Sequence, residues 1–149
     1  MSDRFYKLLA TFFYVGYFPF APGSVASLLG AYLCFLLHNH LLFYISAFIL
    51  LTFMGLLASD RVEKLEKMKD PSCIVIDEVA GAMIAFFLLP MTVKVIVTAF
   101  FLYRAFDMFK IYPADELQEI KGGLGVMSDD LIAGLYTNLI MHTAIWLLG

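Results

Sequence analysis

The chain contains five long apolar runs, and these limit the folds that it can adopt more than any other feature. They cover roughly residues 25–37, 41–58, 79–89, 91–103 and 131–148. Within each run the apolar residues are continuous rather than alternating, and Leu, Met, Ala and Phe dominate, which favours helices over strands. The second and fifth runs have 18 residues each, close to the ~20 that a helix needs to cross a bilayer. The sequence therefore predicts helices in a membrane.

The composition supports a membrane protein over an unusually apolar soluble bundle. Hydrophobic residues make up 62% of the chain and charged residues 15%, against roughly 45–50% and about 25% in soluble domains. A chain of 149 residues has room for one core. We predict an all-α fold, a polytopic membrane helical bundle with about five apolar helices plus short interfacial helices. We expect one domain over residues 1–149.

Charged residues are concentrated at the N-terminus, in residues 59–76 and in residues 104–130. Nine of the ten Lys and Arg residues lie there, Lys94 being the exception, and all 13 acidic residues lie in or directly beside these regions. Cytoplasmic loops carry an excess of Lys and Arg, so we expect these regions on the cytoplasmic side. Within DRVEKLEKMK, residues 60–69, Val62, Leu65 and Met68 recur at helical spacing among charges, which predicts a helix in the membrane interface. The net charge of −3 gives no reason to expect a nucleic-acid partner.

Five carboxylates stand at the cytoplasmic ends of the expected helices: Asp77, Glu78, Asp107, Asp129 and Asp130. Helix capping accounts for an acid at a helix start. It does not account for Asp107 at a helix end, where the dipole disfavours an anion. Because Pro90 turns the third and fourth helices into a hairpin, Asp77 and Glu78 are expected to emerge beside Asp107. Carboxylates in this number favour Mg²⁺ or a similar hard ion.

Groups that bind phosphate are expected beside these acids. Arg104 and Lys110 share a helix face with Asp107, because each lies three residues from it along the chain. The stretch GGLGVMSDD, residues 122–130, is interpreted as a flexible loop whose backbone N–H groups, including that of Gly123, cradle a phosphate at a helix start. A metal held by acids beside two cations suits phosphoryl chemistry on a lipid, since the metal polarises the phosphoryl oxygen and activates a water.

Two alternatives compete with this interpretation. The charged residues can act structurally, as helix caps and as a surface ion-pair ladder. A carboxylate-lined membrane cation transporter is the alternative from another class of protein. Transporters place ionisable residues near the membrane midplane, whereas these acids lie at the ends of the apolar runs, which favours the enzyme.

Four motifs, in order, resemble those of the phosphatidylglycerophosphatase A family of bacterial membrane lipid phosphatases. They are FPFAPGSVASL (18–28), DPSCIVIDEVAG (70–81), YRAFDMFKIYP (103–113) and GGLGVMSDDLIAG (122–134). The resemblance implies an all-helical enzyme that removes the terminal phosphate from phosphatidylglycerophosphate, giving phosphatidylglycerol. It implies Mg²⁺ as cofactor, and a phospholipid substrate and the bilayer as partners; it predicts no oligomeric state.

The resemblance also implies roles for individual residues. The five acids would hold the metal or activate water, and Arg104 and Lys110 would bind the phosphate. Pro22, Gly23 and Ser24 would form a loop beside the head group, with Ser24 as a hydrogen-bond donor. The implied location is the bacterial inner (cytoplasmic) membrane, with several spans and an active site facing the cytoplasm.

Overall fold

The computed structural model describes residues 2–148, and all of its regular secondary structure within that range is helical. Residues 1 and 149 of the predicted domain lie outside the described residues. The elements are α1 (Asp3–Ala10), the short 3-10 helix η1 (Val15–Tyr17), α2 (Pro22–Leu37), α3 (Leu41–Glu66), α4 (Ile76–Ala85), α5 (Val93–Phe109), α6 (Ala114–Gln118) and α7 (Gly123–Leu148). The predicted all-α class is confirmed.

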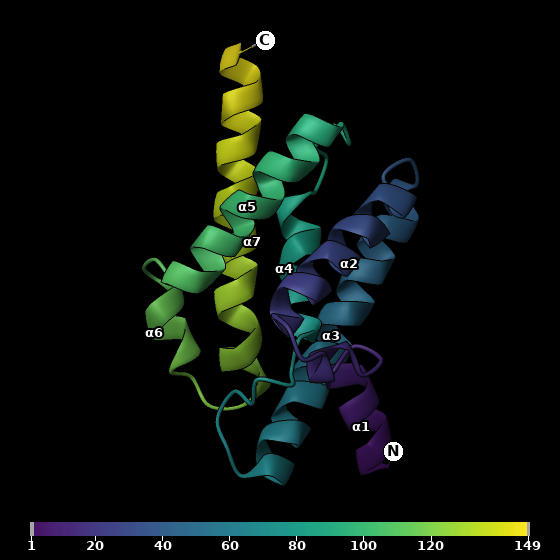
Figure 1. Cartoon of the computed structure of the whole chain (residues 1–149), viewed down its shortest axis with the longest axis vertical. Helices are drawn as coiled ribbons and strands as arrows, with labels where there is room; N and C mark the ends of the chain where they lie inside the picture. The colour runs from purple at the N-terminus through teal and green to yellow at the C-terminus, as the bar shows by residue number, and fades with distance from the viewer. Residues whose placement is uncertain (1, 149) are drawn as a thin grey trace.

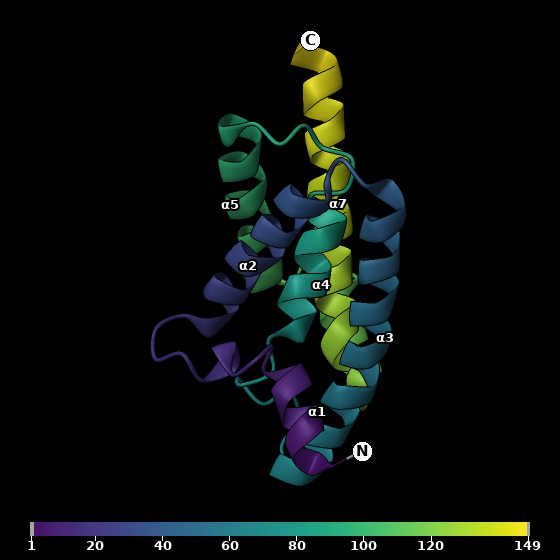
Figure 2. The same ribbon diagram turned by 90° about the vertical axis from the view of Figure 1, so that its right-hand side faces the viewer.

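The short helix α4 lies at the centre of the bundle, with α2, α3, α5 and α7 around it (Figures 1 and 2). Eight of its ten residues are buried. Glycines let it approach α7 closely, because a Cβ on Gly81 would collide with the backbone carbonyl of Asp130, and a Cβ on Gly134 with that of Gly81. Backbone therefore packs on backbone between α4 and α7, which brings the acids near their N-termini together.

Two helices are long and apolar enough to cross a membrane, α3 and α7, each of 26 residues. Their most apolar windows have mean hydropathies of 2.4 and 1.5, and only 17% and 22% of the residues in these windows are buried inside the protein. The prediction of about five spans is thus supported for two helices only. The third apolar run differs most from the prediction, since its helix ends at Ala85 and its side chains pack inside the protein.

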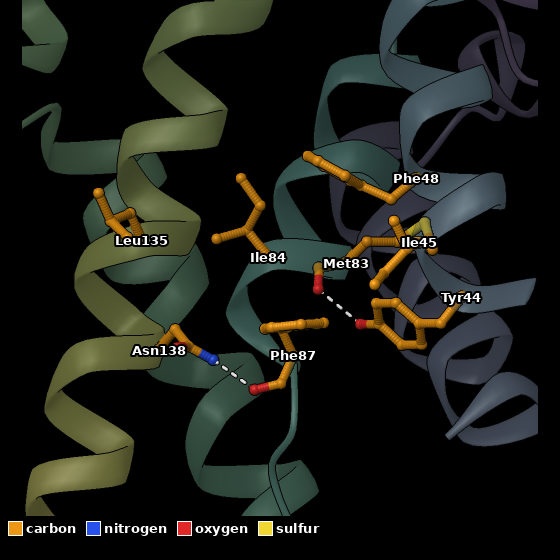
Figure 3. A pocket seen from close by; sticks show the side chains of 8 residues that line it. All are labelled: Tyr44, Ile45, Phe48, Met83, Ile84, Phe87, Leu135 and Asn138. Atoms are coloured by element: carbon orange, nitrogen blue, oxygen red, sulfur yellow. Dashed lines mark hydrogen bonds between the residues drawn. The ribbon is translucent and has the colours of Figure 1, made fainter. Parts of the chain in front are cut away.

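Because α4 ends inside the bundle, side chains of α3 and α7 supply hydrogen bonds to carbonyl groups at and just beyond its end (Figure 3). Tyr44 Oη donates to the Met83 carbonyl at 2.5 Å, and Asn138 Nδ2 donates to the Phe87 carbonyl at 2.8 Å. A carbonyl without a partner is costly away from water, so these contacts allow the helix to stop there. They border an apolar cavity of about 210 Å³ between α3, α4 and α7.

The predicted separate interfacial helix over residues 60–69 is wrong, because α3 continues without a break to Glu66. Apolar and charged residues keep their helical spacing through this stretch, so nothing in it ends the helix. The charged end of α3 pairs with α1 instead. Lys7 lies 2.6 Å from Glu66, and Arg61 lies 2.8 Å from Asp3. The predicted turn at Pro90 is present between α4 and α5.

Candidate active site

The five carboxylates singled out in the sequence come together from three helices. They lie in the first turn of α4 (Asp77, Glu78), the last turn of α5 (Asp107) and the second turn of α7 (Asp129, Asp130). One oxygen each of Asp77, Glu78 and Asp130 lie within 4.8 Å of one another, and the same holds for Asp107, Asp129 and Asp130. Asp130 belongs to both groups, so the five acids form one continuous set, which we call the acid cluster.

The acid cluster is largely buried. Asp77, Asp129 and Asp130 are 5%, 4% and 2% exposed. Burial, reinforced by the charges of Glu78 and Asp130, raises the pKa of Asp77 well above its usual range. Burial also raises the pKa of Glu78, to about 7. So much buried acid is unfavourable in the ionised form unless a cation compensates it.

Two cations near the C-terminus of α5 reach the acid cluster. Arg104 forms an ion pair with Asp107, while its Nε atom is buried and has no hydrogen-bond partner within residues 2–148. Lys110 Nζ donates to Asp129 Oδ2 at 2.5 Å. Burial lowers the pKa of Lys110, but the hydrogen bond and the charge of Asp129 outweigh it, so the net shift is upward. The five acids still outnumber these two cations by three.

The acid cluster also has oxygens that no protein group satisfies. Asp77 Oδ1, Glu78 Oε2 and Asp129 Oδ1 are buried, and none has a hydrogen-bond partner in the described part of the chain. Buried polar atoms are nearly always paired. Unpaired carboxylate oxygens on two helices of the acid cluster, with surplus negative charge, fit a bound hard cation such as Mg²⁺.

Two residues in contact with this site were not identified from the sequence. Tyr103 is fully buried, and its Oη donates to Asp130 Oδ1 at 3.0 Å. Ser27 is also buried, donates to the Gly23 carbonyl at 2.8 Å, and accepts from Arg104 at 3.4 Å. Tyr103 lies four residues before Asp107, and Ser27 lies four residues after Gly23. Residues four apart share a helix face, so this spacing could have indicated that both lie near the site. Within apolar runs, however, Tyr and Ser also occur as ordinary packing residues.

The prediction that residues 122–130 form a flexible loop is wrong. Gly123 begins α7, and of this stretch only Gly122, with φ of 80°, precedes the helix. Gly123 is buried against α3. A Cβ at this position would collide with the backbone carbonyl of Leu56. The glycine at this position thus allows two helices to pack closely. A role for Gly123 in substrate binding stays a prediction.

The predicted loop at Pro22, Gly23 and Ser24 is the first turn of α2. Gly23 faces the acid cluster, since a Cβ there would collide with Glu78 Oε1 and lie 3.4 Å from Arg104 Nη2. Glycine therefore allows α2 to begin directly beside these two side chains. Ser24 is half-buried in the same turn, and its role as a hydrogen-bond donor to a head group stays a prediction.

Comparison with known proteins shows which family the chain resembles. A family model described as phosphatidylglycerophosphatase A matches residues 8–145. A Bacteroides thetaiotaomicron protein named "Putative phosphatidylinositol-3-phosphatase" is 35% identical over 151 residues, 95% of this chain and 94% of that protein.

Two further relatives are named phosphatidylglycerophosphatase A. The one from Haemophilus influenzae is 30% identical over 140 residues, 90% of this chain and 85% of that protein. The one from Escherichia coli is 30% identical over 142 residues, 92% of this chain and 81% of that protein. No solved structure matches the chain significantly.

Proposed function

The chain belongs to the phosphatidylglycerophosphatase A family, and we propose that it hydrolyses phosphatidylglycerophosphate to phosphatidylglycerol and phosphate with Mg²⁺ as cofactor. Family membership makes the chain a phosphatase and confirms the resemblance of its four motifs. The family and the two long apolar helices indicate a bacterial membrane protein that acts on a phospholipid. The observation that carries the proposal is the acid cluster, with its unpaired oxygens, beside Arg104.

In this proposal the acid cluster holds the metal through Asp77, Glu78, Asp107, Asp129 and Asp130. Support comes from the spacing of their oxygens, since groups within 4.8 Å are close enough to share an ion whose bonds to oxygen are about 2.1 Å long. When bound, Mg²⁺ polarises a phosphoryl oxygen and lowers the pKa of a coordinated water. Tyr103 orients Asp130 through its hydrogen bond, which keeps the shared acid in one position.

Arg104 is the residue that we propose binds the phosphate. Its Nε is buried without a partner in the described residues, so the guanidinium has a free donor beside the acids. A planar guanidinium can donate two parallel hydrogen bonds to a phosphate, which fixes the orientation of the group as well as attracting it. Lys110, already bonded to Asp129, adds a positive charge that offsets the charge of the substrate. The absence of a side chain at Gly23 leaves space beside Arg104.

The relative from Bacteroides thetaiotaomicron favours a second candidate substrate, a phosphatidylinositol monophosphate. Both substrates carry a phosphate monoester on the head group of a phospholipid, so the same groups would act on the same kind of phosphorus–oxygen bond. They differ in the bulk of the head group next to the phosphate. The choice between them is therefore a question of selectivity rather than of chemistry.

We also propose that the acid cluster faces the cytoplasm at the bacterial inner membrane. The distribution of charge supports this orientation, because nine of the ten Lys and Arg residues belong to α1, the charged end of α3 and the segments from Lys67 to Lys69 and from Arg104 to Lys121. Lys94, at the start of α5, belongs to the opposite end of that helix. Such an asymmetry is typical of cytoplasmic segments.

The test is phosphate release by the purified protein in detergent micelles, with phosphatidylglycerophosphate, phosphatidylinositol 3-phosphate and phosphatidic acid as separate substrates. We expect release from phosphatidylglycerophosphate that EDTA abolishes and Mg²⁺ restores. Asp107→Asn and Asp129→Asn should each lower the rate about a hundredfold or more, because charge in the site stabilises the transition state. Asp115→Asn, an exposed acid on α6, is the matched control and should retain the rate.

Three results would count against parts of this proposal. Faster release from phosphatidylinositol 3-phosphate selects the second substrate. Activity that survives exhaustive metal removal excludes the role of Mg²⁺. No release from any of the three lipids, by protein that is folded and loaded with Mg²⁺, rejects the phosphomonoesterase and makes cation flux across vesicles the next measurement.

A further inference from the structure

Two segments at the site carry large apolar side chains that the protein does not cover. The first, residues 17–20, leads from η1 to the start of α2 and projects from the bundle in Figure 2. The second, residues 108–112, forms the end of α5 and the turn towards α6, at the edge of the molecule in Figure 1. Their exposed apolar residues are Tyr17, Phe18, Phe20, Met108, Phe109, Ile111 and Tyr112. Phe20 and Phe109 are 77% and 79% exposed.

Both segments are continuous with residues of the site. Phe20 precedes Gly23 by three positions, and Gly23 is the residue of α2 that lies against Glu78. Met108 directly follows Asp107 of the acid cluster. Since α2 meets α5 where Ser27 accepts a hydrogen bond from Arg104, the two apolar segments extend from neighbouring elements beside the acid cluster.

Charge and backbone structure restrict where such segments can lie. Residues 17–20 contain no charged side chain, and the one charge within 108–112, Lys110, turns inward to Asp129. Moving an exposed aromatic side chain from water into an apolar environment is favourable in free energy. Irregular backbone cannot enter the hydrocarbon core, because its N–H and C=O groups would lack partners. Both conditions are met at the boundary between head groups and acyl chains, where Tyr is enriched in membrane proteins.

The position of the acid cluster along α7 agrees with that depth. The start of α7 at Gly123 packs against Leu56, close to the point where α3 changes from apolar to charged residues. Asp129 lies six residues further along α7, which is about 9 Å towards the apolar part of the helix. The acids thus lie on the apolar side of the level at which the charges of α3 begin.

We infer that residues 17–20 and 108–112 form a membrane-docking surface, which inserts at the boundary of head groups and acyl chains and holds the acid cluster at the depth of the lipid phosphate. The partner is the lipid leaflet that carries the substrate. The inference rests on the proposed function for its purpose, because only a lipid substrate requires this depth. The depth itself can be measured without activity.

The measurement uses the fluorescence of single tryptophans in vesicles of phosphatidylcholine and phosphatidylglycerol. Trp146 is the one tryptophan of the chain, so Trp146→Phe provides a background without this signal. In that background Phe20→Trp and Phe109→Trp report on the two segments. Met68→Trp is the matched control, because Met68 is also an exposed apolar residue but lies beyond α3, between Lys67 and Lys69.

We expect phosphatidylcholine brominated on the acyl carbons nearest the head group to quench Phe20→Trp and Phe109→Trp several-fold more strongly than Met68→Trp. Aqueous iodide should show the reverse order. Equal quenching of all three by iodide, with little by brominated lipid, would overturn the inference. Protection from both quenchers, together with a dimer in detergent, would also overturn it and assign the surface to contact between two copies.

A kinetic measurement separates docking from chemistry. Phe20→Ser and Phe109→Ser should each raise the KM for phosphatidylglycerophosphate in mixed micelles by about tenfold, as expected for the loss of one buried aromatic side chain, with kcat little changed. Activity on a short-chain, water-soluble form of the substrate should not change, and Met68→Ser should change neither value. An unchanged KM in micelles contradicts docking. If the unsubstituted protein hydrolyses neither substrate, the proposed function fails, while the quenching result still decides the docking.

Discussion

Tyr103 on α5 donates a hydrogen bond from Oη to Asp130 Oδ1 on α7, at 3.0 Å and in a fully buried position. The same hydroxyl lies 3.2 Å from the backbone carbonyl of Glu78 on α4. The hydroxyl of this α5 residue therefore contacts both of the other helices that supply acids, α4 and α7. Its neighbour along the chain, Arg104, faces the same site. The end of α5 thus contributes both the orientation of Asp130 and the cation beside it.

Tyr103→Phe removes this hydroxyl and keeps the ring, so we expect a protein that folds but hydrolyses its lipid about tenfold more slowly and needs more Mg²⁺ for half-maximal rate. The cost in stability should be about 1 kcal/mol, typical of one buried hydrogen bond. Rates over a Mg²⁺ titration and thermal unfolding measure the two effects. Tyr44→Phe is the control, because it also removes one buried hydroxyl. Tyr44 of α3 donates to the Met83 carbonyl of α4, six residues beyond Asp77, so its loss should leave the Mg²⁺ requirement unchanged. The same requirement in both variants would contradict a role for Tyr103 in the site.

Arg104→Lys keeps the charge but loses Nε and the planar arrangement of donors. We expect kcat/KM to fall about a hundredfold, because an ammonium cannot make the paired hydrogen bonds that orient a phosphate. Steady-state kinetics on micelles measure this loss. Arg61→Lys, at the exposed ion pair with Asp3, is the matched control and should retain activity. Equal activity of the two variants would show that Arg104 acts only by its charge.

Gly23→Ala adds one methyl group where Glu78 and Arg104 already lie. In an ordinary helix this change stabilises by about 1 kcal/mol, because alanine has the higher helix propensity. Here we expect activity to fall about tenfold to a hundredfold, since Glu78 and Arg104 must move to make room. Kinetics together with the melting temperature separate the two effects. A variant with full activity would mean that the space beside Gly23 is not needed for substrate.

Asp130→Asn tests the acid cluster through stability rather than activity. Without metal, we expect the variant to be at least as stable as the unsubstituted protein, because it removes one of several buried like charges. Mg²⁺ at about 100 times its Kd should stabilise the unsubstituted protein by about 2.7 kcal/mol, and the variant by much less. Thermal unfolding in detergent, with EDTA or with Mg²⁺, measures both. An equal Mg²⁺ effect on the two proteins would exclude Asp130 as a ligand.

Asn138→Leu removes the donor that reaches the carbonyls of Ala85 and Phe87 at 3.3 and 2.8 Å. We expect a loss of about 1–2 kcal/mol, as for polar contacts between helices in membranes. The melting temperature in detergent checks this expectation. Thr143→Val on the same helix is the control, because Thr143 donates only to the Leu139 carbonyl of its own helix. Similar losses in both variants would show that the end of α4 needs no external donor.

The all-helical class and the meeting of the five acids followed from local patterns. Continuous apolar runs define helices whatever surrounds them. The turn at Pro90 reverses the chain between α4 and α5, so the start of α4 and the end of α5 were expected on the same side, with Asp107 beside Asp77 and Glu78. The metal and substrate roles of these residues stay predictions.

The sequence was least informative where an interpretation depends on a partner helix. The run 79–89 has the same apolar residues whether lipid or protein surrounds it, so its burial as the short α4 was not foreseen. Gly123 is equally consistent with a loop and with close packing, and only the carbonyl of Leu56 decides between them. Tyr103 was missed for the same reason, because its partner Asp130 lies 27 positions away.

The enclosure of α4 by other helices has a consequence for bilayers of different thickness. A helix that faces lipid responds to a thinner or thicker bilayer by tilting, and α3 and α7 have the exposed apolar surface to do so. Asp77 of α4 is buried within the protein, and Gly81 and Gly134 let α4 pack closely against α7. If α4 and α7 tilt together as one unit, the depth of the acid cluster in the membrane changes. The spacing between Asp77 on α4 and Asp130 on α7 stays the same.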